Sequence, residues 1–103
     1  MSKELEAAFH DEMLNVYDRA KRECGYNAVR FLQMVNEHGG VATAKLLLAS
    51  KHHSEGLTRL WEEGRLDISM EAALLRDPWR KLFSEDELEA ARKRLHDLGY
   101  RHA

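Results

Sequence analysis

Apolar residues recur every three or four positions along most of the chain, which is the period of an amphipathic α-helix. In the opening stretch Phe9, Met13 and Val16 fall on one face, and Gly25 follows as a left-handed stop. We find no alternation of apolar and polar residues with the period of a strand. The pattern therefore predicts an all-α protein.

Start and stop signals divide the next part of the chain into shorter helices. Asn27 is a candidate N-cap for a helix that Gly39 and Gly40 end, because two glycines permit a sharp reversal. A third helix is expected from about Val41 to Ser50. After a polar break, Ser54 and Gly64 are expected to bound a short helix that carries Leu57, Leu60 and Trp61.

The last third of the chain carries equally local signals. A short segment begins at Ser69 and closes before Pro78, since the residue before a proline disfavours helical angles. Ser84 and Glu87 form an S-x-x-E capping box, and Gly99 ends the final helix. We expect residues 1–103 to form one helical domain, a single compact bundle of five to six helices with longer helices at both ends and short helices between.

Composition narrows the class of protein. A chain of 103 residues suffices for one core, and a hydrophobic fraction of 44% with 33% charged residues is ordinary for a folded helical protein. The net charge of −2 gives no overall attraction to phosphate or anionic lipid. A lone Cys24, a charged N-terminus and the lack of a long apolar run predict a cytoplasmic protein that does not enter the membrane.

Four runs of residues are distinctive: NAVRFLQMVNEHGG, AKLLL, SEGLTRLWEEGRLDISMEAALL and LFSEDELEAARKRLHDLGY. In these runs the chain resembles a family of short bacterial all-helical proteins without an established activity. The resemblance covers most of the chain from Tyr17 onward. It implies a helical fold and assigns no cofactor, activity or catalytic residue.

The runs FLQMVNEHGGVATAKLLLAS and LTRLWEEG are also similar to the N-terminal helix-turn-helix of LysR-type regulators. That likeness implies DNA binding through residues 41–65. The break between Leu48 and Leu57 is longer than the tight turn of this motif, and Glu62 and Glu63 would repel phosphate. The alternative is that the glycines and Ala44 allow close packing of helices. The candidate partner or nucleic-acid contacts are Lys45, Lys51, His52, His53, Thr58 and Arg59.

Metal binding and catalysis have weak support in the sequence. His52 and His53 are adjacent, so on a helix their side chains point about 100° apart and do not share one ion. A metal or pH response through this pair stays open as an alternative. Cys24 on an apolar stripe has no visible base, and we see no nucleophile, base and orienting group together. We predict no cofactor, no metal site and no enzymatic activity.

The two tryptophans are expected to differ in their roles. Trp61, next to Leu60, is predicted to fill the core. Trp79 follows Pro78 and precedes Arg80, and tryptophan beside arginine is typical of interface hot spots. Trp79 and Arg80 are therefore candidate interface anchors. The expected function is a protein–protein interaction module that binds a partner protein or a second copy of itself.

Overall fold

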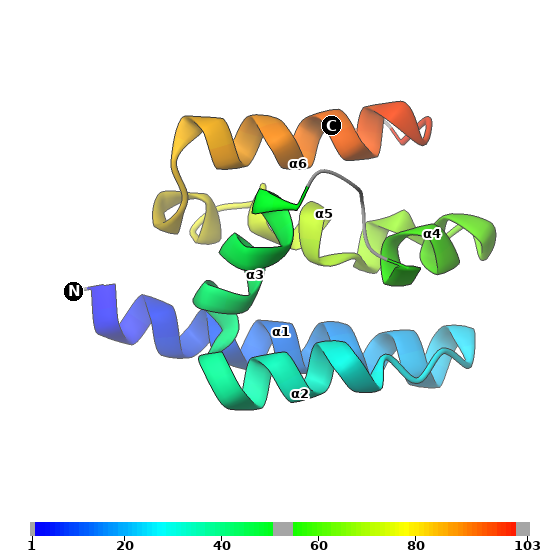
Figure 1. Ribbon diagram of the computed structural model, residues 1–103, viewed down its shortest axis with the longest axis horizontal. Helices are drawn as coiled ribbons and strands as arrows, with labels where there is room; N and C mark the ends of the chain where they lie inside the picture. The colour runs from blue at the N-terminus through cyan, green and yellow to red at the C-terminus, as the bar shows by residue number, and fades with distance from the viewer. Residues whose placement is uncertain (1, 51–54, 101–103) are drawn as a thin grey trace.

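The computed structural model describes residues 2–50 and 55–100, and these contain six α-helices, two short 3-10 helices and no strand (Figure 1). The α-helices are α1 (Ser2–Cys24), α2 (Val29–His38), α3 (Gly40–Ala49), α4 (Glu55–Glu62), α5 (Met70–Leu74) and α6 (Glu85–Asp97). The 3-10 helices are η1 (Leu66–Ile68) and η2 (Trp79–Leu82). The prediction of an all-α bundle with its longer helices at the ends is confirmed.

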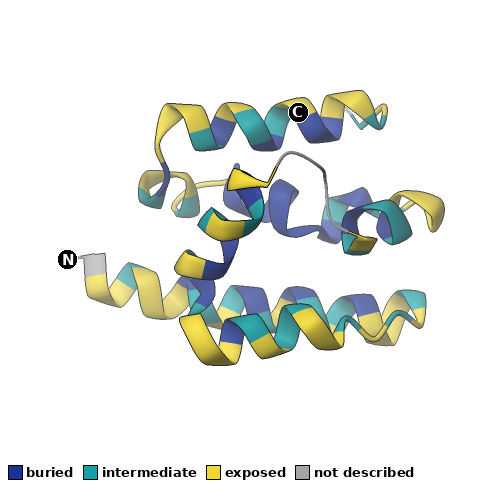
Figure 2. Cartoon of the chain, in the orientation of Figure 1, coloured by how far each residue is buried: buried dark blue, intermediate teal, exposed yellow. Residues whose placement is uncertain are grey.

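The helices form two outer sides joined through a buried middle. In Figure 1, α1 and α2 run side by side along one side of the molecule and α6 runs along the other. Between them, α5 packs on α6, and α3 crosses from the α1–α2 pair to α6. Every residue of α5 is buried, so this short helix lies at the centre of the core (Figure 2).

The double glycine lies where α3 meets α1. The N–H of Gly40 donates a hydrogen bond of 3.1 Å to Nδ1 of His10. A Cβ at Gly40 would lie 2.7 Å from the Cα of His10, so only glycine permits this approach. Thr43 and Ala44 on the next turn are fully buried. The interpretation of this segment as a packing centre is therefore confirmed.

The stop and start signals act as the sequence indicates. Gly25 and Gly99 both have positive φ. The tyrosine that follows each glycine donates its N–H to a carbonyl of the preceding helix, Tyr26 to that of Ala20 and Tyr100 to that of Leu95. The capping box at the start of α6 is complete, with Ser84 and Glu87 each accepting the other's backbone N–H. Ser69 caps α5 by accepting from the N–H of Ala72.

Two local predictions are wrong. Asn27 does not cap α2, which begins at Val29 without a side-chain cap. Oδ1 of Asn27 instead accepts a hydrogen bond from the Tyr17 hydroxyl. Trp61 does not fill the core, because its side chain is 48% exposed while Leu57 and Leu60 carry the buried face of α4. One turn of a short helix has room for only a narrow inward stripe, and two leucines occupy it.

Candidate functional site

Two of the candidate cations, Lys45 and Arg59, are engaged with carboxylates and aromatic rings. Nζ of Lys45 lies 2.8 Å from Glu87 Oε1 and 5.3 Å from the centre of the Phe83 ring. Burial alone would raise the pKa of Glu87, but hydrogen bonds from Lys45 and Ser84 lower it below its usual value. Lys45 therefore joins α3 to the start of α6.

Arg59, on α4, is likewise engaged. Its Nε lies 3.6 Å from Glu63, and its guanidinium lies 5.4 Å from the centre of the Tyr26 ring. Thr58 beside it is half-buried. Lys51, His52 and His53 lie outside the described residues. The structure thus shows no joint positive face made by Lys45 and Arg59, and the DNA-binding and metal-response hypotheses stay predictions.

Trp79 packs inward although it is one of the two predicted anchors. Its ring centre lies 5.7 Å from that of Phe9, and the side chain is half-buried against the core. Arg80 is exposed. The more exposed of the two tryptophans is Trp61, which the sequence predicts to lie in the core.

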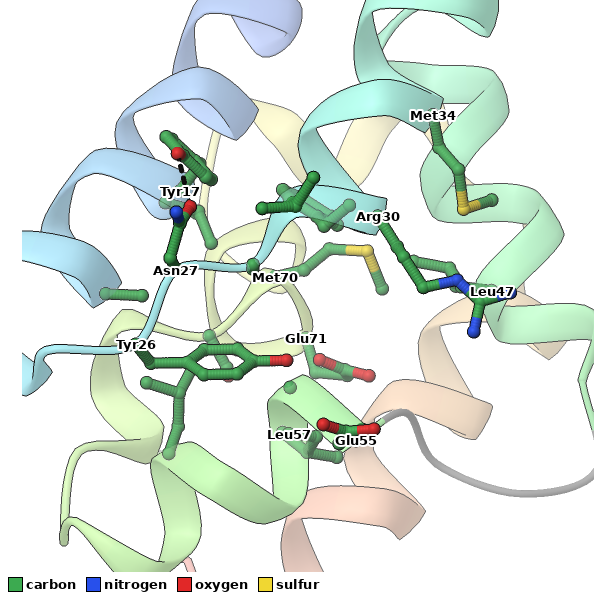
Figure 3. A pocket seen from close by; sticks show the side chains of 18 residues that line it. Tyr17, Tyr26, Asn27, Arg30, Met34, Leu47, Glu55, Leu57, Met70 and Glu71 are labelled. Atoms are coloured by element: carbon green, nitrogen blue, oxygen red, sulfur yellow. Dashed lines mark hydrogen bonds between the residues drawn. The ribbon is translucent and has the colours of Figure 1, made fainter.

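A pocket of about 460 Å³ opens between α1, α2, α4 and the start of α5 (Figure 3). This volume lies within the range of about 300–1,000 Å³ that is typical of ligand pockets. Its lining is mainly apolar and comes from elements far apart in sequence. The apolar side chains include those of Val16, Phe31, Met34, Leu47, Leu57 and Met70.

The turn between α1 and α2 supplies one wall of this pocket. Gly25 ends α1 with a φ of 69°, and the chain then places Tyr26 and Asn27 in the lining. The Tyr17–Asn27 hydrogen bond fixes this turn against α1. Burial, followed by the nearby charge of Glu55, raises the pKa of Tyr26, so its hydroxyl is protonated at neutral pH and is able to donate or accept a hydrogen bond.

An ion-pair network holds the end of α1 against the segment before η1. Glu23 accepts hydrogen bonds from Arg19 and lies 2.8 Å from Arg65, and Arg65 also pairs with Asp67 at 3.1 Å. The hydrogen bonds from Arg19 and Arg65 lower the pKa of Glu23 from 4.5 to about 2. This network fixes the position from which the Tyr26 turn departs.

A buried carboxylate forms part of the pocket lining. Glu71, on α5, is only 2% exposed and pairs with Arg94 of α6 at 3.4 Å. Arg94 also donates to the carbonyl oxygens of Leu48 and Ser50, at 3.2 and 2.6 Å, and so caps the end of α3. One arginine therefore connects α3, α5 and α6.

Sequence reasoning missed this pocket and the Glu71–Arg94 pair. One signal for the pair was available: Glu71 interrupts the run SMEAALL, in which every neighbour is small or apolar. A short helix buried on all sides leaves a charged residue no route to water, so a buried partner is required. The pocket itself had no comparable local signal.

Other kinds of site find no support in the part of the chain that the structure describes. No three His, Cys, Asp or Glu side chains gather there as metal ligands would. Burial raises the pKa of the half-buried Cys24 thiol, which disfavours the reactive thiolate. Among the described residues no helix is long and apolar enough to cross a membrane.

Comparisons with protein-family models, with curated proteins and with solved structures found no match. The resemblance to short bacterial helical proteins therefore stays a prediction.

Proposed function

We propose that this protein is a non-enzymatic interaction module that binds a segment of a partner protein in the pocket between α1, α2, α4 and α5. The observation that carries the proposal is the pocket itself, an apolar hollow of about 460 Å³ with charged groups at its edge. An apolar side chain of a partner would gain free energy by leaving water there, as anchor residues of protein interfaces do.

The polar groups of the lining favour binding over catalysis. Ser69 lines the pocket, but its hydroxyl donates to the carbonyl of Leu66 and accepts from the N–H of Ala72. It is therefore engaged in capping α5, and its proton is held by a backbone carbonyl, whereas an activated nucleophile would donate it to a general base. The carboxylate of Glu71 is engaged with Arg94. These groups support the fold around the pocket.

Val29 provides a point at which the proposal can be tested without disturbing the core. It lines the pocket and yet is 47% exposed. Leu46 is 52% exposed and does not line the pocket, so it is a matched control. Val29→Glu places a charge at the pocket's edge, whereas Leu46→Glu makes the same change elsewhere on the surface.

The experiment selects binders from a random 12-residue peptide library displayed on phage, with the purified protein immobilised. Synthetic versions of enriched peptides are then titrated by fluorescence anisotropy. We expect Val29→Glu to weaken binding at least about tenfold, because a charge would be desolvated at an apolar contact, and Leu46→Glu to leave it unchanged.

Two results would contradict the proposal: a selection that enriches no peptide, or peptides whose affinity Val29→Glu does not alter. Sedimentation of the free protein over a range of concentrations is a useful companion measurement. Self-association that Val29→Glu abolishes would assign the pocket to a second copy of this chain in place of another protein.

A further inference from the structure

Two opposite charges stand on different walls of the pocket. Arg30 comes from α2 and Glu55 from the first turn of α4, and both side chains line the pocket and are exposed. Neither forms a hydrogen bond or an ion pair with any other described residue within 4.0 Å. They are therefore available to a binding partner.

The neighbouring charges are already engaged in the fold. Glu71 pairs with Arg94, and Arg59 lies near both Glu63 and the ring of Tyr26. Because their charges are offset locally, they contribute less to the field at the mouth of the pocket. Arg30 and Glu55 are therefore the two charges of the pocket lining that are not engaged in ion pairs among the described residues.

The two charges belong to different ends of the pocket. Figure 3 shows the hydroxyl of Tyr26 and the carboxylates of Glu55 and Glu71 pointing toward the same end. The nearby charge of Glu55 also contributes to the raised pKa of Tyr26, which agrees with this placement. Arg30 extends on the side where Met34 and Leu47 lie. The pocket thus has an acidic end and a basic edge with apolar surface between.

We propose that the partner segment inserts one apolar side chain into the pocket and flanks it with a basic residue that meets Glu55 and an acidic residue that meets Arg30. This inference rests on the proposed function. Burial of the apolar side chain supplies most of the affinity, while the two flanking charges set the direction in which the segment lies. A segment of reversed charge order would place like charges together at both ends.

The expected effect of each charge is modest. Ion pairs between partly exposed groups change affinity by about two- to fivefold in water, and like charges oppose binding by a similar factor. Reversal of one charge on the protein therefore changes the affinity for a matched peptide by about four- to twenty-fivefold. Both side chains are exposed, so the fold tolerates their substitution.

The test compares the peptides that four forms of the protein select from the random 12-residue library: the wild type, Arg30→Glu, Glu55→Lys and the control Glu62→Lys. Glu62 is exposed on the same helix as Glu55 but does not line the pocket. We expect the wild type and the control to enrich an apolar residue between one basic and one acidic residue. Peptides selected by Glu55→Lys should carry an acidic residue in place of the basic one. Peptides selected by Arg30→Glu should carry a basic residue in place of the acidic one.

Reciprocal titration separates recognition from a structural effect. Glu55 also stabilises the start of α4 through the helix dipole, so its replacement could weaken every peptide equally. Recognition instead predicts that Glu55→Lys weakens a wild-type peptide and that changing the peptide's own lysine to glutamate restores the affinity. Thermal melts of each variant record any change of stability.

Peptides that bind in the pocket with no charge preference, or that lose affinity without reciprocal rescue, would overturn this inference and leave the proposed function intact. A library that yields no pocket-dependent peptide would overturn both.

Discussion

Replacement of Gly40 by alanine has two opposing effects on the stability of the fold, one through local helix propensity and one through tertiary packing. Gly40 is the first residue of α3, where alanine has the higher helix propensity by at most about 1 kcal/mol. Propensity alone therefore predicts a more stable protein. In the fold, however, the new Cβ would meet the Cα of His10 at 2.7 Å and Cγ of Met13 at 3.2 Å.

The contact with the backbone of His10 decides whether Gly40→Ala stabilises or destabilises the protein. The Cα of His10 belongs to α1 and cannot rotate away, so α1 and α3 have to separate. Overpacking of this kind costs about 1–3 kcal/mol, and loss of the Gly40–His10 hydrogen bond adds about 0.5–1.5 kcal/mol. After subtraction of the propensity gain of about 1 kcal/mol, we expect Gly40→Ala to lower the free energy of unfolding by about 0.5–3.5 kcal/mol.

Urea denaturation followed by circular dichroism at 222 nm measures this change, and the melting temperature should fall by about 2–28 °C. Ala42→Gly, at an exposed position of the same helix, calibrates the propensity effect and should cost about 0.5–1 kcal/mol. A Gly40→Ala variant as stable as the wild type would refute the close approach of α1 and α3.

Three further substitutions test the interior and the ion pairs. Arg94→Ala leaves the carboxylate of Glu71 without its arginine and should cost about 3–5 kcal/mol in urea denaturation; a cost below about 1 kcal/mol would contradict the buried pair. The hydroxyl of Thr43 is buried without a hydrogen-bond partner among the described residues, so Thr43→Val should stabilise the protein by about 1 kcal/mol, whereas Thr43→Ser should destabilise it. The pKa of Glu23 is lowered to about 2, so its contribution to stability is present above about pH 4.5 and is lost as the pH falls toward 2. Glu23→Gln should therefore lose less stability than the wild type between pH 5 and pH 2.5, and equal losses would argue against the network.

Signals within a few residues predicted the helices well. The glycine stop at Gly25, the capping box at Ser84 and the buried stripe through Phe9 each act within one or two turns of a helix, and each is present in the structure. Such features depend on backbone geometry and local hydrogen bonds, which the neighbouring residues determine. The sequence was therefore sufficient for the fold class and most helix ends.

Features that depend on the meeting of distant helices were beyond this reasoning. Glu71 and Arg94 are separated by 23 positions, and no periodicity links them. The sequence predicts a buried Trp61 and a more exposed Trp79, and the structure shows the reverse. Burial at a helix end depends on which element packs there, and a single sequence does not give this. The pocket depends in the same way on how α1, α2, α4 and α5 meet, and its lining residues belong to ordinary amphipathic faces.

The pocket results from short helices that do not cover one another completely. The network around Glu23 fixes the end of α1, and Arg94 fixes α3 against α5 and α6. The turn through Tyr26, between α1 and α2, supplies one wall of the pocket. Because these contacts hold the walls from outside, the hollow does not have to collapse for the fold to be stable. A preformed pocket lowers the cost of ordering on binding.

The most direct test of the docking proposal is a map of amide chemical-shift changes in the labelled protein as the tightest selected peptide is added. We predict that the largest changes fall on the pocket walls, at residues such as Tyr26, Val29, Arg30 and Leu57. Changes centred instead on η2 and the outer face of α6, around Arg80 and Lys93, would show that the partner binds elsewhere and would contradict the account.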